Sequence, residues 1–122
     1  MQPNATELEI LKIFWEHERL SARELHDRLD EANCWSISTT RTMLERMRAK
    51  NLLSREAVHG IAVYAAVDGK VQVLGSVIRR LARGVLEVRG ELPVNAFSGS
   101  ALLSAAELAE IAELVNRPDD PQ

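Results

Sequence analysis

The sequence predicts a mostly α-helical protein with one small β-hairpin. Three amphipathic segments with helical spacing open the chain, a segment of alternating residues follows, and two further amphipathic segments come after it. Apolar residues make up 46% of the 122 residues and aromatic residues only 4%, so a core of aliphatic side chains is expected. This length fits one domain, or a small domain with an appended oligomerisation element.

Composition limits the chemistry and the compartment. Cys34 is the only cysteine, which excludes an intrachain disulfide and a cluster of thiolate ligands. We expect no metal site and no cofactor. The first residues lack the basic and apolar regions of a signal peptide, and the longest apolar run, residues 61–67, is too short to span a bilayer. A soluble, cytoplasmic protein without a membrane partner is therefore expected.

Capping boxes predict where the first two helices begin. Thr6 with Glu9 predicts an N-cap before a helix from about Glu7 to His17. Ser21 with Glu24 predicts a second helix of about three turns. Its narrow apolar face consists of Ala22, Leu25, Leu29 and Ala32.

The third predicted helix has Ser36 as its N-cap and two very different faces. The core face consists of Ile37, Thr40, Leu44 and Met47. The opposite face carries Ser38, Thr39, Arg41, Thr42, Glu45, Arg46, Arg48 and Lys50. An arginine among short hydroxyls suits a helix in the DNA major groove, because arginine binds guanine through two hydrogen bonds and hydroxyls bind phosphates or base edges.

The charge of this region is local. Residues 36–55 contain five basic side chains and one acid, a net charge of +4, whereas the whole chain carries −3. The bases are Arg41, Arg46, Arg48, Lys50 and Arg55. An ordinary surface helix whose basic end complements its own dipole would look similar, so the surrounding elements have to decide.

After Lys50 the apolar spacing changes to a period of two. Ile61, Val63, Ala65 and Val67 alternate on one face with Tyr64 on the other, after an alternating segment that begins at Leu53. His59-Gly60 lies where a hairpin would turn. A helix-turn-helix followed directly by a hairpin is a winged helix, so residues 1–68 are predicted to form a winged-helix DNA-binding domain.

The C-terminal region is predicted to be helical, with two segments. The first has a coiled-coil spacing of apolar residues: Val71, Leu74, Ile78, Leu81, Val85 and Val88. Gly75 and Gly84 each disfavour it by roughly 1 kcal/mol, so it needs a partner helix. In the second segment, Ser104 and Glu107 form a capping box before an apolar stripe: Leu108, Ile111 and Leu114.

Two amphipathic helices without a third to complete a bundle predict pairing with a second copy of the chain. We expect residues 69–116 to form a helical dimerisation region and residues 117–122 to be a disordered tail. The residues expected at the dimer interface are Val71, Leu74, Ile78, Leu81, Val85, Leu108, Ile111 and Leu114.

Several segments of the chain resemble the penicillinase repressor family, the winged-helix repressors of β-lactamase, methicillin-resistance and copper-transport operons. They are TELEILKIFWE, SARELHDRL, STTRTMLERM, KNLLSRE and VYAAV, with residues 39–44 the most specific. The resemblance covers residues 6–68 well and the C-terminal helices loosely. It implies a homodimer whose recognition helices enter successive major grooves of a palindromic operator and whose C-terminal helices form the interface.

The resemblance also implies roles for individual residues. Ser38, Thr39 and Arg41 match the base-reading region, and residues at the family's backbone-contact positions are Thr42, Arg46 and Lys50. Arg55 belongs to the same basic stretch. The wing, AVHGIAV, lacks the charged residues that family members place around its glycine, which leaves His59 as the DNA-contact candidate at the tip.

Two further departures concern the inducing signal. The copper-responsive branch carries a cysteine cluster near its C-terminus, and none exists here. In the protease-controlled branch an Asn-Phe bond between the C-terminal helices is cleaved, whereas this chain has Asn95, Ala96 and Phe97 in the corresponding linker. This linker is a candidate site for a sensor-controlled protease.

The sequence also bears on three other functions. An enzyme is not expected, because Cys34 and the histidines His17, His26 and His59 lack an accompanying nucleophile elbow, phosphate loop or metal-spaced cluster. A winged-helix protein-interaction module without specific DNA binding would expose large apolar residues on the Ser36 helix, which instead presents hydroxyls and arginines. A ligand-sensing winged-helix regulator would need a concave apolar site between the C-terminal helices and the wing.

Overall fold

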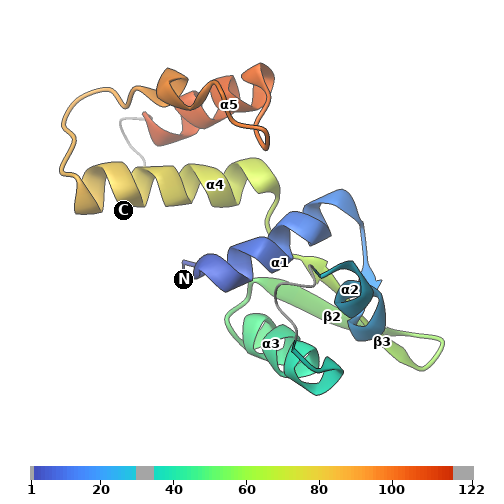
Figure 1. Cartoon of the computed structure of the whole chain (residues 1–122). Coiled ribbons are helices and arrows are strands. Elements are labelled where there is room, and N and C mark those ends of the chain that lie inside the picture. Colours follow the sequence, from blue (N-terminus) through green and yellow to red (C-terminus); the bar gives the residue numbers. More distant parts are fainter. Residues whose placement is uncertain (1, 30–34, 117–122) are drawn as a thin grey trace. The chain divides into compact units, whose positions relative to one another are not determined.

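The computed structural model describes residues 2–29 and 35–116 and divides into two compact units, Met1–Gly69 and Lys70–Gln122 (Figure 1). The elements of the first unit are α1 (Ala5–Glu16), β1 (Leu20–Ser21), α2 (Ala22–Arg28), α3 (Ile37–Ala49), β2 (Leu53–Val58) and β3 (Ile61–Ala66). Those of the second are α4 (Lys70–Arg79), η2 (Arg80–Val85), η3 (Val94–Phe97) and α5 (Ala105–Val115). The predicted fold class, mostly helical with a small hairpin, is confirmed.

The start of α1 differs from the prediction. Asn4, not Thr6, is the N-cap: its Oδ1 accepts a hydrogen bond from Glu7 N at 2.8 Å, while Glu7 Oε1 accepts one from Asn4 N at 2.9 Å. This reciprocal pair satisfies two N–H groups at the helix start. Glu9, the predicted partner of Thr6, instead accepts a hydrogen bond from Lys12 Nζ at 2.7 Å.

The capping box of α2 is confirmed, but the helix is shorter than predicted. Glu24 N donates to Ser21 Oγ at 3.2 Å, and Ser21 N donates to Glu24 Oε1 at 2.9 Å. The helix ends at Arg28 because the backbone of Leu29 is extended, with φ −74° and ψ 144°. Ala32, which was assigned to the same apolar face, lies outside the described residues.

The helix α3 follows its predicted N-cap, with Thr39 N donating to Ser36 Oγ at 3.2 Å. Three of the four predicted core positions have no exposed surface: Thr40, Leu44 and Met47. Ile37, in the first turn, is only half-buried. They join a core built from every element of the unit: Ile10, Leu11, Phe14, Leu20, Leu25, Leu53 and Tyr64.

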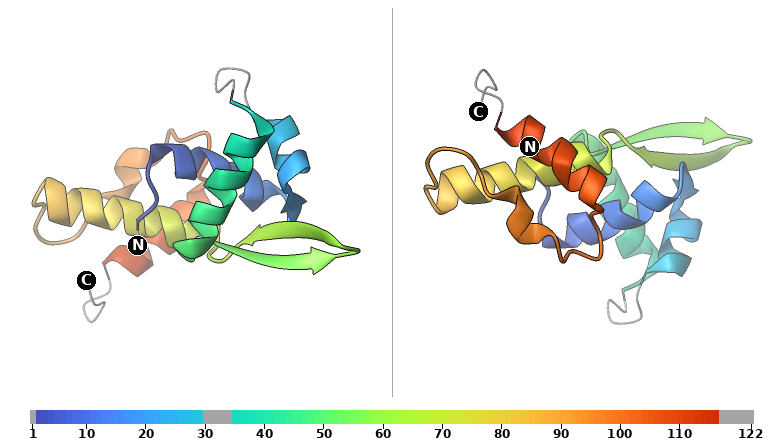
Figure 2. Two further views of the ribbon diagram at one scale, coloured as in Figure 1. Left: turned by 90° about the horizontal axis from the view of Figure 1, so that it is seen from below. Right: turned by 90° about the horizontal axis from the view of Figure 1, so that it is seen from above.

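The predicted hairpin and its turn are confirmed. His59 and Gly60 both have positive φ, 51° and 79°, which is the backbone that a two-residue hairpin turn with the strands' own twist requires. The hairpin extends beyond α2 and α3 in both views of Figure 2. Tyr64 lies on the buried face of β3, whereas Ile61 on the other face is 59% exposed and Val67, just after the strand, is 52% exposed.

A third strand was not predicted. β1 pairs antiparallel with β3, placing Leu20 opposite Tyr64, and gives the sheet the order β1-β3-β2. Two residues are too few for a periodic pattern, so only the pairing partner defines this strand. The central strand β3 is thereby hydrogen-bonded on both edges near Tyr64, while the outer part of the hairpin has only its own two strands.

In the second unit, α4 and α5 pack together (Figure 1) around an apolar cluster. The cluster consists of Leu92, Val94, Leu103, Leu108, Ile111 and Val115, and the residues half-buried against it include Val71, Leu74, Ile78, Ala82 and Val88. The seam, which is the row of apolar residues from Val71 to Val88 predicted to need a partner helix, therefore packs over most of its length against this cluster of the same chain.

The predicted helix from Val71 to Val88 changes from α-helical to π-helical at Arg80 and ends at Val85. The chain continues as the π-helical segment η2, whose last turn is closed by a hydrogen bond from Leu86 N to Leu81 O at 2.8 Å. Ala82 now lies on the cluster, while Leu81 is 44% and Val85 62% exposed. The wider turn breaks the strict spacing on which the seam depended.

Candidate nucleic-acid interface

The first two turns of α3 expose hydroxyl groups. Ser38, Thr39 and Thr42 are exposed, and the Ser36 hydroxyl lies 3.0 Å from Ser38 Oγ and 3.2 Å from Thr39 Oγ1. Thr42 Oγ1 donates to Ser38 O at 3.0 Å. Every one of these contacts lies within α3 or its cap, so the hydroxyls can turn toward a ligand without breaking a contact to another element.

Two arginines of α3 are exposed and carry no partner. Arg41 lies in the second turn and Arg46 in the third, and neither forms a hydrogen bond or ion pair within residues 2–29 and 35–116. A guanidinium has five donors and stays charged at any physiological pH. Both side chains are thus available to a partner outside the chain.

A cleft of about 880 Å³ lies between α3, the start of α2 and the hairpin. The cationic side chains that line it are Arg23, Arg41 and Arg55, joined by His59, and the acidic ones are Glu24 and Glu45. The predicted contacts Arg41, Arg55 and His59 therefore share one surface. His59 stands at the hairpin tip, because its left-handed backbone forms the turn.

Glu45, in the lining of this cleft, binds three other side chains. Its Oε2 accepts hydrogen bonds from Tyr64 Oη at 2.5 Å and from Arg55 Nη1 at 3.3 Å. Its Oε1 accepts one from Arg48 Nε at 3.0 Å. Arg48 and Arg55 are therefore both paired, unlike Arg41 and Arg46.

These contacts shift the pKa values of Tyr64 and Glu45, which are the donor and the acceptor of one hydrogen bond. Burial and the hydrogen bond to Glu45 raise the pKa of Tyr64 to about 12. The Tyr64 hydroxyl and then Arg48 and Arg55 lower the pKa of Glu45 below its ordinary value. Glu45 is accordingly a carboxylate and Tyr64 a neutral phenol at neutral pH.

Lys50 lies in an ion pair rather than free at the surface. As the C-cap of α3 it places Nζ 2.6 Å from Glu7 Oε1, and its side chain is 22% exposed. The Glu7 side chain is fully buried, and its Oε2 has no hydrogen-bond partner in the described part of the chain. The backbone contact predicted for Lys50 would compete with this pair, because one ammonium would have to serve a buried carboxylate and a phosphate.

A second polar contact joins the two helices of the helix-turn-helix. His26 Nδ1 of α2 lies 2.8 Å from Thr40 Oγ1, and Thr40 is fully buried. The contact satisfies a hydroxyl inside the core and fixes how α2 braces α3.

Sequence reasoning missed the roles of Glu7, Glu45 and Tyr64. For Glu7 a signal existed, because Asn4 and Glu7 have capping-box spacing, but the same spacing at Thr6 and Glu9 competed with it. Glu45 stood out only as the one acid in a basic stretch. Its partners come from a hairpin 10 and 19 residues away, which no local pattern reveals.

The predicted dimer residues fall into two groups. Leu108 and Ile111 are buried in the core of the second unit, and those half-buried with them are Val71, Leu74, Ile78 and Leu114. Leu81 and Val85 are exposed, next to Leu86 at 64% and Phe97 at 42% exposure. A small apolar depression of about 120 Å³ lies among these side chains, with Leu81, Leu86 and Phe97 in its wall.

The predicted protease linker forms a turn at the surface. Asn95, Ala96 and Phe97 are exposed within the 3-10 helix η3. Leu92 and Val94 just before them are buried in the apolar cluster. The segment is thus accessible, and it is joined directly to residues that hold the second unit together.

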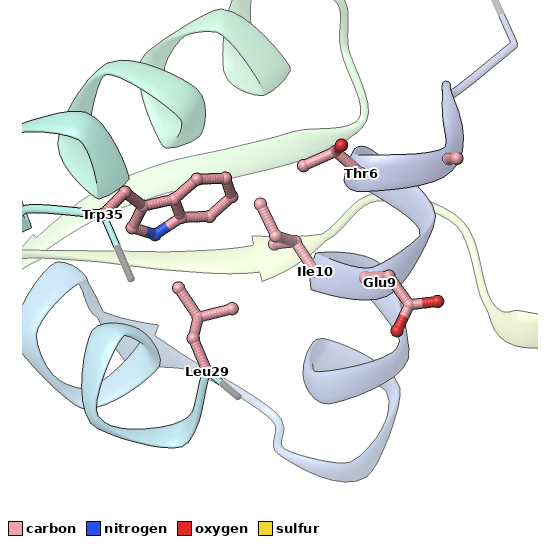
Figure 3. Close-up of a pocket in the computed structure, with 6 residues that line it drawn as sticks. Thr6, Glu9, Ile10, Leu29 and Trp35 are labelled. Atoms are coloured by element: carbon pink, nitrogen blue, oxygen red, sulfur yellow. The ribbon is translucent and has the colours of Figure 1, made fainter. Parts of the chain in front are cut away.

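A separate cavity of about 170 Å³ lies between α1 and Trp35, the residue before the N-cap of α3 (Figure 3). The Trp35 ring faces Ile10 and Leu29, and Thr6 and Glu9 of α1 complete the lining (Figure 3). Trp35 Nε1 is buried with no hydrogen-bond partner among the described residues. The ring packs at the edge of the core and does not belong to the cleft of α3.

Within residues 2–29 and 35–116, no three side chains of the metal-binding types come together. No helix in the same part of the chain is both long enough and apolar enough to cross a membrane.

A family model described as Penicillinase repressor matches residues 4–117. A penicillinase repressor from Bacillus licheniformis is 32% identical over 63 residues, which are 52% of this chain and 49% of that protein. The chain therefore spans about half the length of this curated relative.

Proposed function

This chain belongs to the penicillinase repressor family, and we propose that it is a DNA-binding transcriptional repressor that acts as a homodimer on a palindromic operator. The observation that carries the proposal is the solvent face of α3, where hydroxyls and two unpaired arginines are exposed. Exposed side chains of α3 include no large apolar residue, which disfavours a protein-docking helix. We assign α3 as the recognition helix.

The roles within α3 follow from reach and from existing contacts. Ser38, Thr39 and Arg41 read base edges, since they lie in the first turns, where a recognition helix contacts bases. Thr42 and Arg46 contact the phosphate backbone. Arg55 and His59 offer hydrogen-bond donors across the cleft as far as the hairpin tip, where a neighbouring stretch of backbone would lie.

The homodimer is proposed to form through the exposed apolar side chains at the end of η2. Leu81, Val85, Leu86 and Phe97 lie exposed in the second unit. Large apolar side chains that cluster at a surface favour association, because their contact removes apolar area from water. The buried residues of the predicted set, such as Ile111, would support this surface from inside the unit rather than touch a partner.

The test of function is recovery of a symmetric DNA site. Selection of duplexes from a random pool should yield a dyad-symmetric sequence with half-site centres ~34 Å apart, one helical turn, because two recognition helices related by a two-fold axis face successive major grooves. Affinity for that duplex should fall steeply as salt is raised. Recovery of no dyad-symmetric sequence would contradict the proposal.

The test of dimerisation uses residues that the fold does not need. Leu86→Asp and Val85→Asp should give a folded monomer in sedimentation, since both side chains are more than half exposed within their own chain. Glu113→Gln is a matched control, because Glu113 is an exposed residue of α5 outside the apolar cluster. A wild-type protein that sediments as a monomer at tens of micromolar would contradict the dimer.

We further propose that a sensor-controlled protease cleaves the Asn95 to Phe97 segment to end repression. Cutting there would separate Leu92 and Val94 from α5, which they contact in the apolar cluster, and so weaken the unit that pairs the two copies. Limited proteolysis followed by mass spectrometry and sedimentation tests this. A chain cut in this segment that keeps full dimer stability and operator affinity would contradict the proposal.

A further inference from the structure

The carboxylate of Glu45 links α3 to the hairpin through hydrogen bonds. Arg55 and Tyr64 face each other in the register of β2 and β3, and both donate to Glu45 Oε2. Glu45 thus binds both strands of the hairpin at the same level, while its other oxygen is bound by Arg48 of its own helix. Outward from this level the pairs run from Glu56 and Val63 to the turn.

A carboxylate in this place is costly for a protein that binds DNA. Glu45 lines the same cleft as Arg41 and is the one acid among five bases from residue 36 to residue 55. A phosphate entering the cleft is repelled by it, and two of the bases are already paired with it. Its three hydrogen bonds supply the structural role that offsets this repulsion.

Apart from its packing in the core, the hairpin has one other polar side-chain contact to the rest of the unit among the described residues. Arg19 pairs with Glu56 at 2.5 Å, but both side chains are about half exposed, and such pairs contribute little. Backbone pairing with β1 is limited to Leu20 and Ser21, which lie opposite Tyr64 and Val63. Tyr64, by contrast, is 5% exposed, so its bond to the Glu45 side chain, which is 39% exposed, is sheltered from water on the tyrosine side.

We propose that Glu45 is a positioning residue of the DNA interface, which joins α3 to the hairpin so that the recognition helix and the wing engage one duplex as a single body. This inference rests on the proposed DNA-binding function. Glu45 also binds the guanidinium groups of Arg55, which lines the cleft, and of Arg48 on its own helix. Its effect on DNA is therefore exerted through these partners and not by contact with a base.

The first arm of the test needs no DNA. Tyr64 is the only tyrosine of the chain, so its ring carbon bonded to oxygen, labelled with carbon-13, gives one NMR signal that reports its ionisation. In the wild type this signal should titrate near the pKa of about 12. In Glu45→Gln the pKa should fall part of the way toward 10.0, because burial still raises it. An unchanged titration would show that Glu45 does not hold Tyr64.

The second arm measures specificity on DNA. Tyr64→Phe removes only the hydroxyl, and Glu45→Asp keeps the charge but shortens the reach. Each should lower the ratio of dyad-site to random-duplex affinity by about twofold to thirtyfold, the usual range for residues that modulate coupling between two contact regions. Glu56→Gln, a charge change on the same hairpin that leaves Glu45 untouched, should keep the ratio.

The readouts separate positioning from stability and from failure of the proposed function. A merely structural role would lower both affinities in proportion to the folded fraction and leave their ratio unchanged, and circular dichroism gives that fraction. If the wild type prefers the dyad site and both variants keep its ratio, the inference is overturned. If the wild type itself has no dyad preference, the proposed function fails, and the tyrosine titration still decides whether Glu45 holds the hairpin.

Discussion

In the first two turns of α3 the exposed side chains contact only their own helix and its cap, whereas Glu45 and Lys50 nearer its other end bind side chains from distant parts of the chain. Ser38, Thr39 and Arg41 are thus free to adjust around a ligand. The later turns are held by α1 and by the hairpin. One helix therefore separates two tasks along its length: a start that is available for recognition and an end that sets its orientation.

Two basic residues behave differently at the two ends of α3. Arg41 has no partner in the described part of the chain, while Lys50 compensates a fully buried carboxylate. A count of basic residues along the sequence treats the two alike. The comparison teaches that such a count does not show which positive charges are already paired with a carboxylate of the same chain.

The largest effect is expected from Lys50→Ala, which leaves Glu7 buried without its ion-pair partner. Unfolding free energy should fall by about 3 kcal/mol, at the lower end for buried pairs because Lys50 is 22% exposed. Urea denaturation measures it. The double variant Glu7→Gln with Lys50→Met should recover part of the loss, since no charge is then left buried alone.

Lys50→Ala also sharpens the comparison on DNA. Under conditions where the variant is fully folded, the salt slope of binding should match that of the wild type, because the ammonium serves Glu7. Arg46→Ala is the matched control one turn away and should reduce the slope by about one. A reduced slope for Lys50→Ala would show that Lys50 does contact the DNA backbone.

The next largest effect is expected from Arg41→Ala, in the second turn of α3. Affinity for the dyad site should fall by about 1 to 3 kcal/mol, and discrimination should be lost at one base pair per half-site. Stability should stay within about 0.5 kcal/mol of the wild type, because the side chain is exposed and unpaired. Anisotropy titrations on specific and random duplexes measure both affinities. An unchanged ratio between them would remove Arg41 from the base-reading residues.

The smallest effect is expected at alkaline pH and concerns Tyr64, which binds Glu45 in the later turns of α3. The folded pKa of Tyr64, about 12, lies above the ordinary value of 10.0, so the stability that its neutral form contributes is complete below pH 10 and is lost between pH 10 and about 12. Just above pH 10 the wild type should lose stability more steeply than Tyr64→Phe, which cannot ionise there. Chemical denaturation at several pH values measures this. Equal slopes would show that Tyr64 is not held in its neutral form.

Local sequence patterns were sufficient to predict where α3 begins, where the hairpin turns and which residues of α3 face the core. The start of α3 after Ser36 and the His59-Gly60 turn were predictable because capping and turn geometry depend on residues within a few positions of one another. The core residues Leu44 and Met47 followed from helical spacing for the same reason. The exposed face of α3 then consists of the positions that remain once the core positions are assigned.

Tertiary structure alone decided which polar groups are free. The pairs of Lys50 with Glu7 and of Tyr64 with Glu45 join residues 43 and 19 positions apart, and the strand β1 exists only through its pairing with β3. It also decided that η2 turns Leu81 and Val85 outward and that α5 covers the rest of the seam. Sequence spacing reports which residues share a face of one element, whereas packing and charge pairing depend on which elements meet, and that is a property of the folded chain.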